Sequence, residues 1–341
     1  HEPQSCKPLA AQTPVLKTPH PANPSPVRGV PPEVWSPPGP HGQQHWHEGH
    51  PECGGRAQSP IDIVTSRAQP DPSLPPLRPE GYEHPESPEL TLANNGHTAV
   101  LALPPSLRLG GLPHTFAAVQ LHFHWGRPGH AAGAEHLLDG HRAPAEMHVV
   151  HFDAERFADA SAAQQHLGGL AVLGVLLEVR RGRAEPQIPL PARPKLLAPT
   201  GQRVAIPSFS IRDLLPAHLE RYYRYNGSLT TPPCSQSVLW TLFPQPVRIS
   251  RAQVGALQGS LYSTEEGEPE EPQLLVDNFR APQELNQRLV LSSFPRGEIA
   301  SPSSAFLSRQ GESRASRVSP SRGEGKGEPR GEETAPLAPG A

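Results

Sequence analysis

Cysteine is scarce in this chain of 341 residues, which holds only Cys6, Cys53 and Cys234. Three scattered cysteines exclude a disulfide-stapled scaffold and a cysteine-based zinc site, and they allow one bridge at most. Long apolar runs are missing too, because no stretch approaches the roughly 20 apolar residues that a membrane-spanning helix needs. The first residues, from His1 onward, lack the charged-then-apolar pattern of a signal peptide. We therefore expect no membrane span in the chain as given.

An excess of charge of one sign is also missing. Lys and Arg number 30 and Asp and Glu number 33, which gives a formal net charge of -3. The two signs are intermixed, without the basic face that a phosphate backbone demands. We therefore expect no nucleic-acid partner.

Proline and glycine, by contrast, are abundant, with 46 and 30 residues. Proline lacks a backbone donor and breaks helix interiors, so this composition suits many short strands and turns better than long helices. The length exceeds that of a usual single domain, but all-β domains often reach about two hundred residues or more. We therefore expect one mainly β domain flanked by tails.

The two ends of the chain differ in composition from its middle. Residues 1–40 hold twelve prolines with few large apolar groups between them, and Ser, Gly, Glu and Arg dominate after Phe294. Such segments cannot bury enough apolar surface to order themselves. We therefore predict a Pro-rich disordered segment at 1–34, a folded domain at 35–294 and a disordered tail at 295–341.

Short apolar segments separated by turn signals fill the middle of the chain and are typical of strands. They are Glu89–Leu92, Ala99–Leu103, Val119–Trp125, Glu146–Phe152 and Leu170–Val179. Two other segments, Arg212–Glu220 and Ser250–Leu261, have helix-like spacing but are brief. We expect the helices to be peripheral.

Two histidines share one predicted strand. Period-two alternation puts His122 and His124 on one face together with Gln120. His148 follows 148 − 124 = 24 residues later, far enough for the chain to turn and return antiparallel with a third imidazole. Three neutral histidines leave a tetrahedral zinc ion one open position for water, which is typical of catalytic sites. The pattern therefore predicts a catalytic zinc site.

Other polar residues bear on this prediction. Gln120 and Glu146 each stand two residues before a predicted ligand, where they could accept the outward ring N–H and fix the tautomer. We interpret His45-Trp46-His47 as a chance pair, because no alternating strand surrounds it. A structural zinc site would need a fourth protein ligand, and none stands out near His148, since His151 falls on the opposite strand face.

Several motifs, taken together, resemble one enzyme family. They are Gln58–Ile63, Asn94–His97, Gln120–Gly126, Glu135-His136, Glu146–His148, Leu170–Gly174 and Ser228–Pro233. In order and spacing they resemble the α-class carbonic anhydrases over about residues 35–294, roughly three quarters of the chain. The resemblance implies a zinc hydro-lyase that hydrates carbon dioxide reversibly to bicarbonate and a proton. It also implies a single domain on a large, mostly antiparallel twisted sheet with short peripheral helices.

The resemblance assigns roles to single residues. His122, His124 and His148 match the zinc ligands. Thr230 matches a gatekeeping threonine, and Glu135 matches the carboxylate that takes its hydroxyl hydrogen. Because a carboxylate only accepts, the Thr230 oxygen is left to accept from zinc-bound hydroxide, the nucleophile. The Thr230 backbone N–H can then meet the oxygen charge that develops on the substrate.

The proton shuttle of the family matches His97, which follows the turn signal Asn94-Asn95-Gly96. An unperturbed imidazole pKa of about 6.5 suits a proton acceptor. Taken alone, His97 would read as an ordinary surface histidine. The family has an active-site tyrosine two residues after the tryptophan that matches Trp35, whereas this chain has Pro37. Because proline has no hydroxyl to order a water chain, we expect altered proton transfer.

The substrate side of the family site also has counterparts here. They are Thr230, Thr231, Val150, Val172, Leu170, Leu229 and Trp240. The apolar members match the wall that receives carbon dioxide, although as isolated residues they would simply be core. The resemblance further implies binding of sulfonamide-type inhibitors.

Some features look most similar to the extracellular, membrane-associated members of the family. They are Gly227–Cys234, Ser263–Glu266 and Cys53. A matching cysteine pair in those members implies a Cys53–Cys234 disulfide, and the alternative is two reduced, buried thiols of a cytosolic protein. Asn226 opens an Asn-Gly-Ser acceptor for glycosylation, which has meaning only in a secreted chain. The likeness favours an extracellular or cell-surface location.

Two functions remain open from the sequence. The first is an active hydratase. The second is a catalytically silent carbonic anhydrase-like domain that serves as a binding or adhesion module, a state that in this family typically accompanies loss of a zinc-binding histidine. All three histidines are present, which favours the enzyme.

Overall fold

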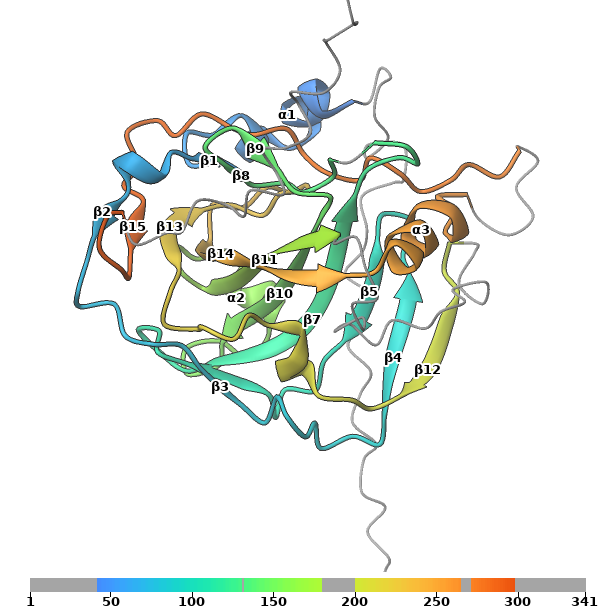
Figure 1. Cartoon of the computed structure of the whole chain (residues 1–341), viewed down its shortest axis with the longest axis horizontal. Helices are drawn as coiled ribbons and strands as arrows, with labels where there is room; N and C mark the ends of the chain where they lie inside the picture. The colour runs from blue at the N-terminus through green and yellow to red at the C-terminus, as the bar shows by residue number, and fades with distance from the viewer. Residues whose placement is uncertain (1–41, 131, 180–199, 265–270, 298–341) are drawn as a thin grey trace, which may run out of the picture. The chain divides into compact units, whose positions relative to one another are not determined.

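The computed structural model describes residues 42–130, 132–179, 200–264 and 271–297 (Figure 1). The predicted N-terminal segment at 1–34 lies outside the described residues, as does the predicted C-terminal tail from residue 298 onward. Trp35 and Pro37 lie outside them too. The family-like motifs identified in the sequence otherwise lie within the described residues, except for the end of Ser263–Glu266.

One large twisted sheet dominates the molecule (Figure 1). Its main path runs through β12 (Arg203–Pro207), β4 (Glu89–Asn94), β5 (Ala99–Ala102), β7 (Phe116–Trp125), β10 (Ala145–Asp153), β11 (Leu170–Val179), β14 (Val238–Ile249), β13 (Tyr223–Gly227), β15 (Leu291–Ser292) and β2 (Gln69–Pro70). Neighbours on this path pair antiparallel, except for the parallel pairs β11–β14 and β15–β2. The prediction of a mostly antiparallel sheet is confirmed.

Shorter strands extend this arrangement. β3 (Arg78–Glu80) pairs with β6 (Arg108–Gly110), and β6 also pairs with β7. A separate small sheet is formed by β1 (Asp62–Ile63), β8 (Leu137–Leu138) and β9 (His141–Arg142). β8 begins directly after Glu135 and His136, so its pairing with β1 and β9 helps to fix that segment.

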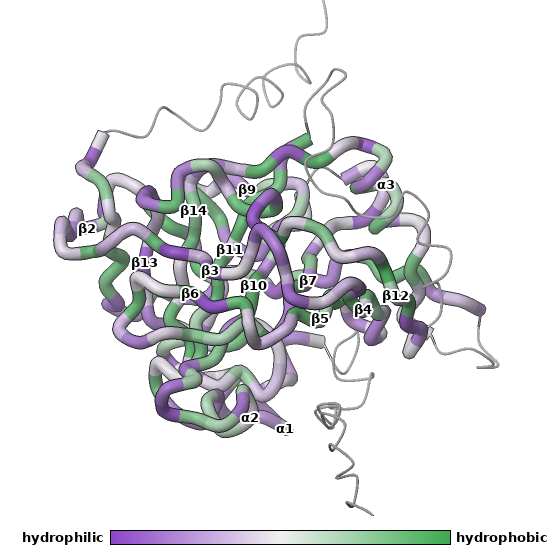
Figure 2. The backbone as a smooth tube through the Cα atoms, turned by 90° about the horizontal axis from the view of Figure 1, so that it is seen from below, coloured by the Kyte–Doolittle hydropathy of each residue, from purple (hydrophilic) through white to green (hydrophobic). Residues whose placement is uncertain are grey.

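The central strands are buried on both faces, and this explains their composition. All but the last residue of β11 are buried, and the strand reads as a nearly continuous apolar run. Ala171, Leu173 and Val175 pack into the main core, whereas Leu170 and Val172 face the other side. Figure 2 shows hydrophobic stretches along these central strands. A strand covered on both sides favours branched apolar residues throughout, rather than polar and apolar residues in alternation.

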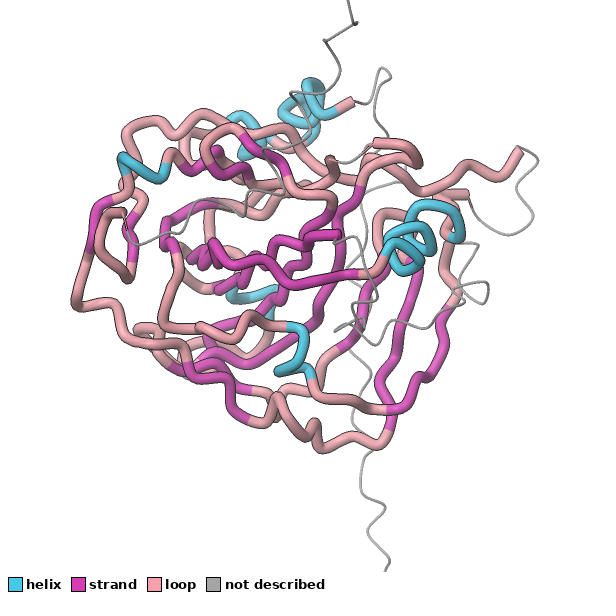
Figure 3. Tube along the Cα trace, viewed as in Figure 1, coloured by secondary structure: helices cyan, strands magenta, loops and turns pink. Residues whose placement is uncertain are grey.

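The helices are short and lie outside the sheet (Figure 3). The α-helices are α1 (Trp46–Gly49), α2 (Ala160–Ala163) and α3 (Arg251–Ser260), and the 3-10 helices are η2 (Gln43–His45), η3 (Pro51–Gly54), η4 (Thr65–Arg67) and η6 (Ile211–Leu214). Ser250 starts α3 with a capping box, as its side chain accepts from the Gln253 N–H and the Gln253 side chain accepts in return.

The prediction of a helix at Arg212–Glu220 is wrong in extent. Only the single 3-10 turn η6 forms, and the chain leaves helical geometry at Leu215, where ψ is 155°. Pro216 follows directly, and the residue before a proline is driven to extended backbone by the proline ring. The apolar spacing in this segment instead puts Leu214, Leu215 and Leu219 into the main core.

Candidate metal centre

The register between β7 and β10 gathers the three histidines. His148 lies directly opposite His122, and Glu146 lies directly opposite His124. Since side chains two residues apart share a face of a strand, all four point to the same side of the sheet. The three predicted ligands therefore lie together, as the alternation indicated.

The three imidazole rings form a tight cluster. Ring centroids lie 5.0 Å apart for His122 and His124, 5.1 Å apart for His122 and His148, and 4.5 Å apart for His124 and His148. Nε2 of His124 and Nδ1 of His148 are 3.1 Å apart. The ligand atoms of these three residues are close enough to one another to hold a single metal ion.

Each ring nitrogen that faces away from the cluster has an acceptor. Nδ1 of His122 lies 2.9 Å from Oε1 of Gln120, and Nε2 of His148 lies 2.8 Å from Oε1 of Glu146. Nδ1 of His124 lies 2.7 Å from the backbone carbonyl oxygen of Asn278. These oxygens can only accept, so each ring carries its hydrogen on the outward nitrogen and presents a lone pair inward.

The inward donor set suits zinc. Nε2 of His122, Nε2 of His124 and Nδ1 of His148 are left unprotonated, each with a lone pair that points inward. The lone pairs of His124 and His148 repel each other at 3.1 Å, and a cation bound between them would remove this repulsion. Burial and the neighbouring imidazoles lower the pKa of His122 and of His148, and burial lowers the pKa of His124 to about 4. Neutral imidazoles are the form that zinc binds, with three of them leaving one position open.

A second group of possible ligands overlaps the first, but its atoms are already committed. It consists of His136, Glu146 and His148. Nδ1 of His136 donates to Oε1 of Glu146 over 2.7 Å, and Nε2 of His136 meets the Tyr225 hydroxyl at 2.7 Å. Oε2 of Glu146 accepts from the backbone N–H groups of Glu135 and His136. This cluster therefore orients the His148 ring and is not a second metal site.

Glu146 stays ionised in this buried network. Burial by itself would raise its pKa, but His136 and His148 oppose this by charge and hydrogen bonding and hold the pKa of Glu146 well below its ordinary value. An ionised Glu146 is a stronger acceptor for the His148 ring than a neutral side chain. In the sequence, His136 belongs to the Glu135-His136 motif but has no assigned role, and nothing singles out Tyr225.

Glu135 lies beside the cluster. Its Oε1 accepts the backbone N–H of Arg280 over 2.7 Å, and its Oε2 lies 3.5 Å from Nε2 of His124 with no hydrogen-bond partner among the described protein atoms. Burial raises the pKa of Glu135, and the charge of His148, the Arg280 N–H and the neighbouring Thr230 side chain reduce that rise without cancelling it. Thr230 is itself buried next to this carboxyl group.

An apolar surface adjoins the histidines along the sheet. Val150, Val172 and Trp240 occupy one row across β10, β11 and β14, and the row continues to Gln120 on β7. Leu170 lies two residues before Val172, and all four apolar side chains are buried. Leu229 is partly exposed in the loop that also carries Thr230. The predicted wall residues therefore come from neighbouring strands and one loop.

His97 lies in the turn between β4 and β5. Oδ1 of Asn95 accepts from the backbone N–H groups of His97 and Thr98, and Gly96 has φ of 85°, a left-handed conformation that glycine adopts readily. His97 is partly buried, and burial lowers its pKa to about 4. This pKa lies below the unperturbed value of about 6.5, because the imidazole is less hydrated than that of a surface histidine.

Two other histidine predictions concern residues outside the cluster. His45 pairs with Glu48 over 2.7 Å beside α1, and His47 is exposed on that helix. His151 points away from the cluster, where its Nε2 meets the Tyr82 hydroxyl. Neither His45-Trp46-His47 nor His151 contributes to the groups of described residues that could hold a metal.

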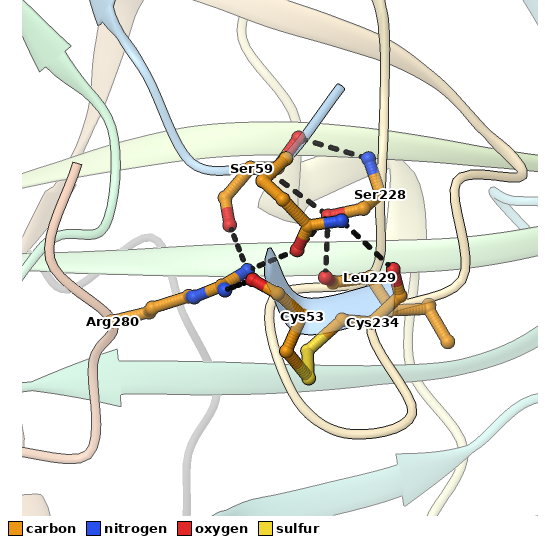
Figure 4. The surroundings of a disulfide bond; sticks show 7 residues. Cys53, Ser59, Ser228, Leu229, Cys234 and Arg280 are labelled. Atoms are coloured by element: carbon orange, nitrogen blue, oxygen red, sulfur yellow. Dashed lines mark hydrogen bonds between the residues drawn. A yellow bond between two sulfur atoms is a disulfide. The ribbon is translucent and has the colours of Figure 1, made fainter. Parts of the chain in front are cut away.

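The disulfide between Cys53 and Cys234 is present, with Cα atoms 4.9 Å apart (Figure 4). The Gln58 side chain donates to the carbonyl oxygen of Cys234 over 3.1 Å and accepts from the Arg280 guanidinium over 2.7 Å. Leu229 donates its backbone N–H to Ser235 over 3.0 Å within the same loop. The bridge therefore fastens the loop that carries Thr230 to the N-terminal part of the domain.

Sequence comparisons agree with the geometry of this site. A family model described as eukaryotic-type carbonic anhydrase matches residues 41–294. Carbonic anhydrase 12 of Homo sapiens is 40% identical over 286 residues, which are 84% of this chain and 79% of that protein. Carbonic anhydrase 6 of Homo sapiens is 35% identical over 75% of this chain and 82% of its own length. Carbonic anhydrase 15 of Mus musculus is 39% identical over 76% of this chain and 82% of its own length.

Proposed function

The chain belongs to the eukaryotic-type carbonic anhydrases, zinc enzymes that hydrate carbon dioxide, and on that premise we propose which of its residues carry the reaction. We assign the zinc to His122, His124 and His148. The single observation that supports this most is the convergence of three unprotonated ring nitrogens, each fixed by an acceptor behind its ring. Zinc bound there supplies a water whose pKa is lowered to about 7, an established property of this family, and hence hydroxide at neutral pH.

Thr230 and Glu135 aim the nucleophile. An ionised Glu135 accepts the Thr230 hydroxyl hydrogen, which leaves the Thr230 oxygen only as an acceptor. The Thr230 oxygen would then accept the hydrogen of the nucleophile and so turn the nucleophile's lone pair toward the substrate carbon. The Arg280 N–H that donates to Glu135 supports this assignment, because it favours the ionised carboxylate against the burial that raises its pKa. Thr230 is buried beside this carboxyl group.

The apolar row receives the substrate. Carbon dioxide has no net charge, so an apolar surface next to the nucleophile can hold it without strong polar contacts. Val150, Val172, Leu170, Leu229 and Trp240 form that surface in our assignment. Thr230 and Thr231 complete the site on its polar side, with the Thr230 backbone N–H facing the oxygen that gains charge. Sulfonamide-type inhibitors are expected to compete for the same place.

His97 accepts the proton that leaves the site. It is neutral at pH 7 and so able to accept, but a pKa of about 4 makes the transfer from a donor of pKa about 7 uphill by roughly three pKa units, or about 4 kcal/mol. Proton export is therefore expected to be slower than through an exposed histidine. Pro37 has no hydroxyl to order a water chain, so we expect it to alter proton transfer as well.

We propose an extracellular or cell-surface location. Disulfides persist in oxidising compartments, and the Cys53–Cys234 bridge supports such a place. Asn226 is exposed near the end of β13, whereas Gly227 and Ser228 of the same acceptor are buried, so glycosylation at Asn226 would depend on the Asn side chain alone being reachable. We also infer from the motifs of Gly227–Cys234 a likeness to the extracellular, membrane-associated members, carbonic anhydrase XIV among them. No helix among the described residues has the length and apolar character to cross a bilayer.

Stopped-flow measurement of carbon dioxide hydration, with and without a zinc chelator, tests this assignment. We expect turnover that is lost on zinc removal and restored by added zinc. An absence of turnover in protein that retains zinc would instead indicate the catalytically silent binding or adhesion module. The folded domain is proposed to span 35–294, and a chain trimmed to those residues should retain full turnover.

A further inference from the structure

We infer that the side chain of Asn278 is a positioning residue that holds the His97 turn against strand β7 and so sets the rate of proton export. This inference rests on the proposed role of His97 as the proton acceptor. Asn278 lies 181 residues after His97, in the segment that follows α3. Its backbone carbonyl accepts from His124, but the inference concerns only its side chain.

Both ends of the Asn278 side-chain amide, the nitrogen and the oxygen, make hydrogen bonds to backbone groups. Nδ2 donates to the backbone carbonyl oxygen of His97 over 2.9 Å and to that of Phe123 over 3.2 Å. Oδ1 accepts the backbone N–H of Trp125 over 2.8 Å. A primary amide offers two N–H donors and one carbonyl acceptor at once, whereas a hydroxyl has a single donor, a carboxylate only accepts and an apolar side chain does neither.

These contacts join the proposed proton acceptor to the strand that carries two zinc ligands. Phe123 and Trp125 flank His124 on β7, so Asn278 is fixed to the backbone on both sides of that ligand. The bond to the carbonyl of His97 then ties the turn to the same strand. Thr98 adds a neighbouring contact, since its hydroxyl accepts the N–H of Phe123 over 3.1 Å.

The side-chain contacts can be separated from the contact with the metal site. Any substitution of Asn278 keeps the backbone carbonyl that accepts from His124 over 2.7 Å. The bond to His97 is lost in Asn278→Asp, which keeps an acceptor for Trp125, and in Asn278→Leu, which has a similar shape and no charge. A geometric role predicts the same direction of change in both variants.

Proton transfer along a water chain depends steeply on where the acceptor lies. A misplacement of about 1 Å can cost about 100-fold in rate at a reacting centre. The zinc-loaded full chain would be studied by exchange of oxygen-18 between carbon dioxide and water. This exchange gives one rate for interconversion of carbon dioxide and bicarbonate and a second, proton-dependent rate for release of labelled water.

We expect both Asn278 variants to lower the ratio of the second rate to the first about tenfold. Asp277→Asn is the matched control, because Asp277 is the preceding residue and contacts Arg127 instead of His97. This control should leave the ratio unchanged. In a His97→Ala background, Asn278→Asp should cause no further fall, since the acceptor that it positions is gone.

Several results would overturn the inference. One is an unchanged ratio in both variants of Asn278, which would mean that Thr98 alone holds the turn. Another is an equal fall of both rates or a loss of zinc, which would mean a structural role only. A further fall in the His97→Ala background would also count against it. If His97→Ala itself leaves the second rate unchanged, the proposed proton acceptor is wrong and the inference fails with it.

Discussion

The backbone N–H of Arg280 donates a 2.7 Å hydrogen bond to Oε1 of Glu135, so the carboxylate that we propose to orient the nucleophile depends on where Arg280 lies. The guanidinium of Arg280 is buried and donates to the carbonyl oxygen of Cys53 over 2.9 Å and to that of Ser59 over 2.9 Å (Figure 4). One residue therefore connects the disulfide to the reaction site.

Removal of the disulfide should affect both stability and catalysis. We expect Cys53→Ser with Cys234→Ser to lower the free energy of unfolding by about 2–5 kcal/mol, because a bridge that spans 181 residues constrains the unfolded chain. Turnover should also fall while zinc is retained, since Arg280 and the Thr230 loop lose a fixed neighbour. Urea unfolding and stopped-flow hydration measure the two effects. Cys6→Ser is the control, and an unchanged unfolding midpoint in the double variant would contradict the prediction.

The zinc assignment predicts different outcomes for two histidines. His148→Ala should lower zinc affinity by more than about 100-fold and abolish hydration. Loss of a residue that only orients a ligand typically lowers metal affinity about 10- to 100-fold, and loss of the ligand itself should lower it further. His47→Ala should change neither, since this residue is exposed on α1. Metal analysis after dialysis and stopped-flow hydration check both, and the opposite result would overturn the assignment.

Gln120 orients the zinc ligand His122 but does not bind zinc itself, so its loss should weaken zinc binding without abolishing it. Gln120→Ala removes the oxygen that lies 2.9 Å from Nδ1 of His122, so the ring loses its fixed tautomer. We expect zinc affinity to fall about 10- to 100-fold. Competition with a chelator of known affinity measures this. The exposed Gln165, changed to Ala, serves as the control, and equal affinities in the two variants would show that the Gln120 contact is not needed.

Proton export should depend on His97. His97→Ala is expected to slow steady-state hydration about tenfold or more at low buffer concentration, and added imidazole should restore it, because the lost step is general-base proton transfer. NMR titration of the His97 ring should give a midpoint near pH 4, as burial lowers its pKa to about 4. Turnover that is the same with and without His97 would argue against the shuttle. Pro37→Tyr should alter only the buffer-sensitive part of the rate.

Acid should destabilise the fold through His151. Burial lowers the pKa of His151 to about 4, whereas the unfolded chain binds that proton at about 6.5. The neutral, buried ring therefore contributes its full stability above pH 6.5, and this contribution is lost as the pH falls toward 4. The contribution of His151 to the free energy of unfolding changes by about 3 kcal/mol, because the two pKa values differ by about 2.5 units at about 1.4 kcal/mol each.

His151→Gln should remove this slope. The difference in free energy of unfolding between the zinc-loaded parent and this variant should change by about 3 kcal/mol between pH 7 and pH 4, and protonation of the zinc ligands cancels because both proteins share it. Urea unfolding across this pH range measures it. A difference that stays constant with pH would mean that His151 does not titrate on unfolding. Replacement of the bond to Tyr82 adds only a constant offset.

Part of the fold followed from local patterns, and part did not. The sequence predicts the strand at Leu170–Val179 and the helix that starts at Ser250. Both could be predicted because an apolar run and an N-cap residue determine the backbone of only a few neighbouring residues. The helix expected at Arg212–Glu220 failed, because the pull of the core on its leucines and the backbone restriction before Pro216 outweighed helix-like spacing. The lowered pKa of His97 could not be predicted, since it depends on how other segments cover the ring.

The sequence by itself determined which side chains share the metal-facing side of β7 and β10, because alternation along a strand is a property of the local backbone. Only the tertiary structure decided that His124 donates to the carbonyl of Asn278 and that the N–H of Arg280 holds Glu135. Backbone groups are the same in nearly every residue, so they leave no mark in the sequence. Their partners here lie 154 and 145 residues away, and folding alone brings them together.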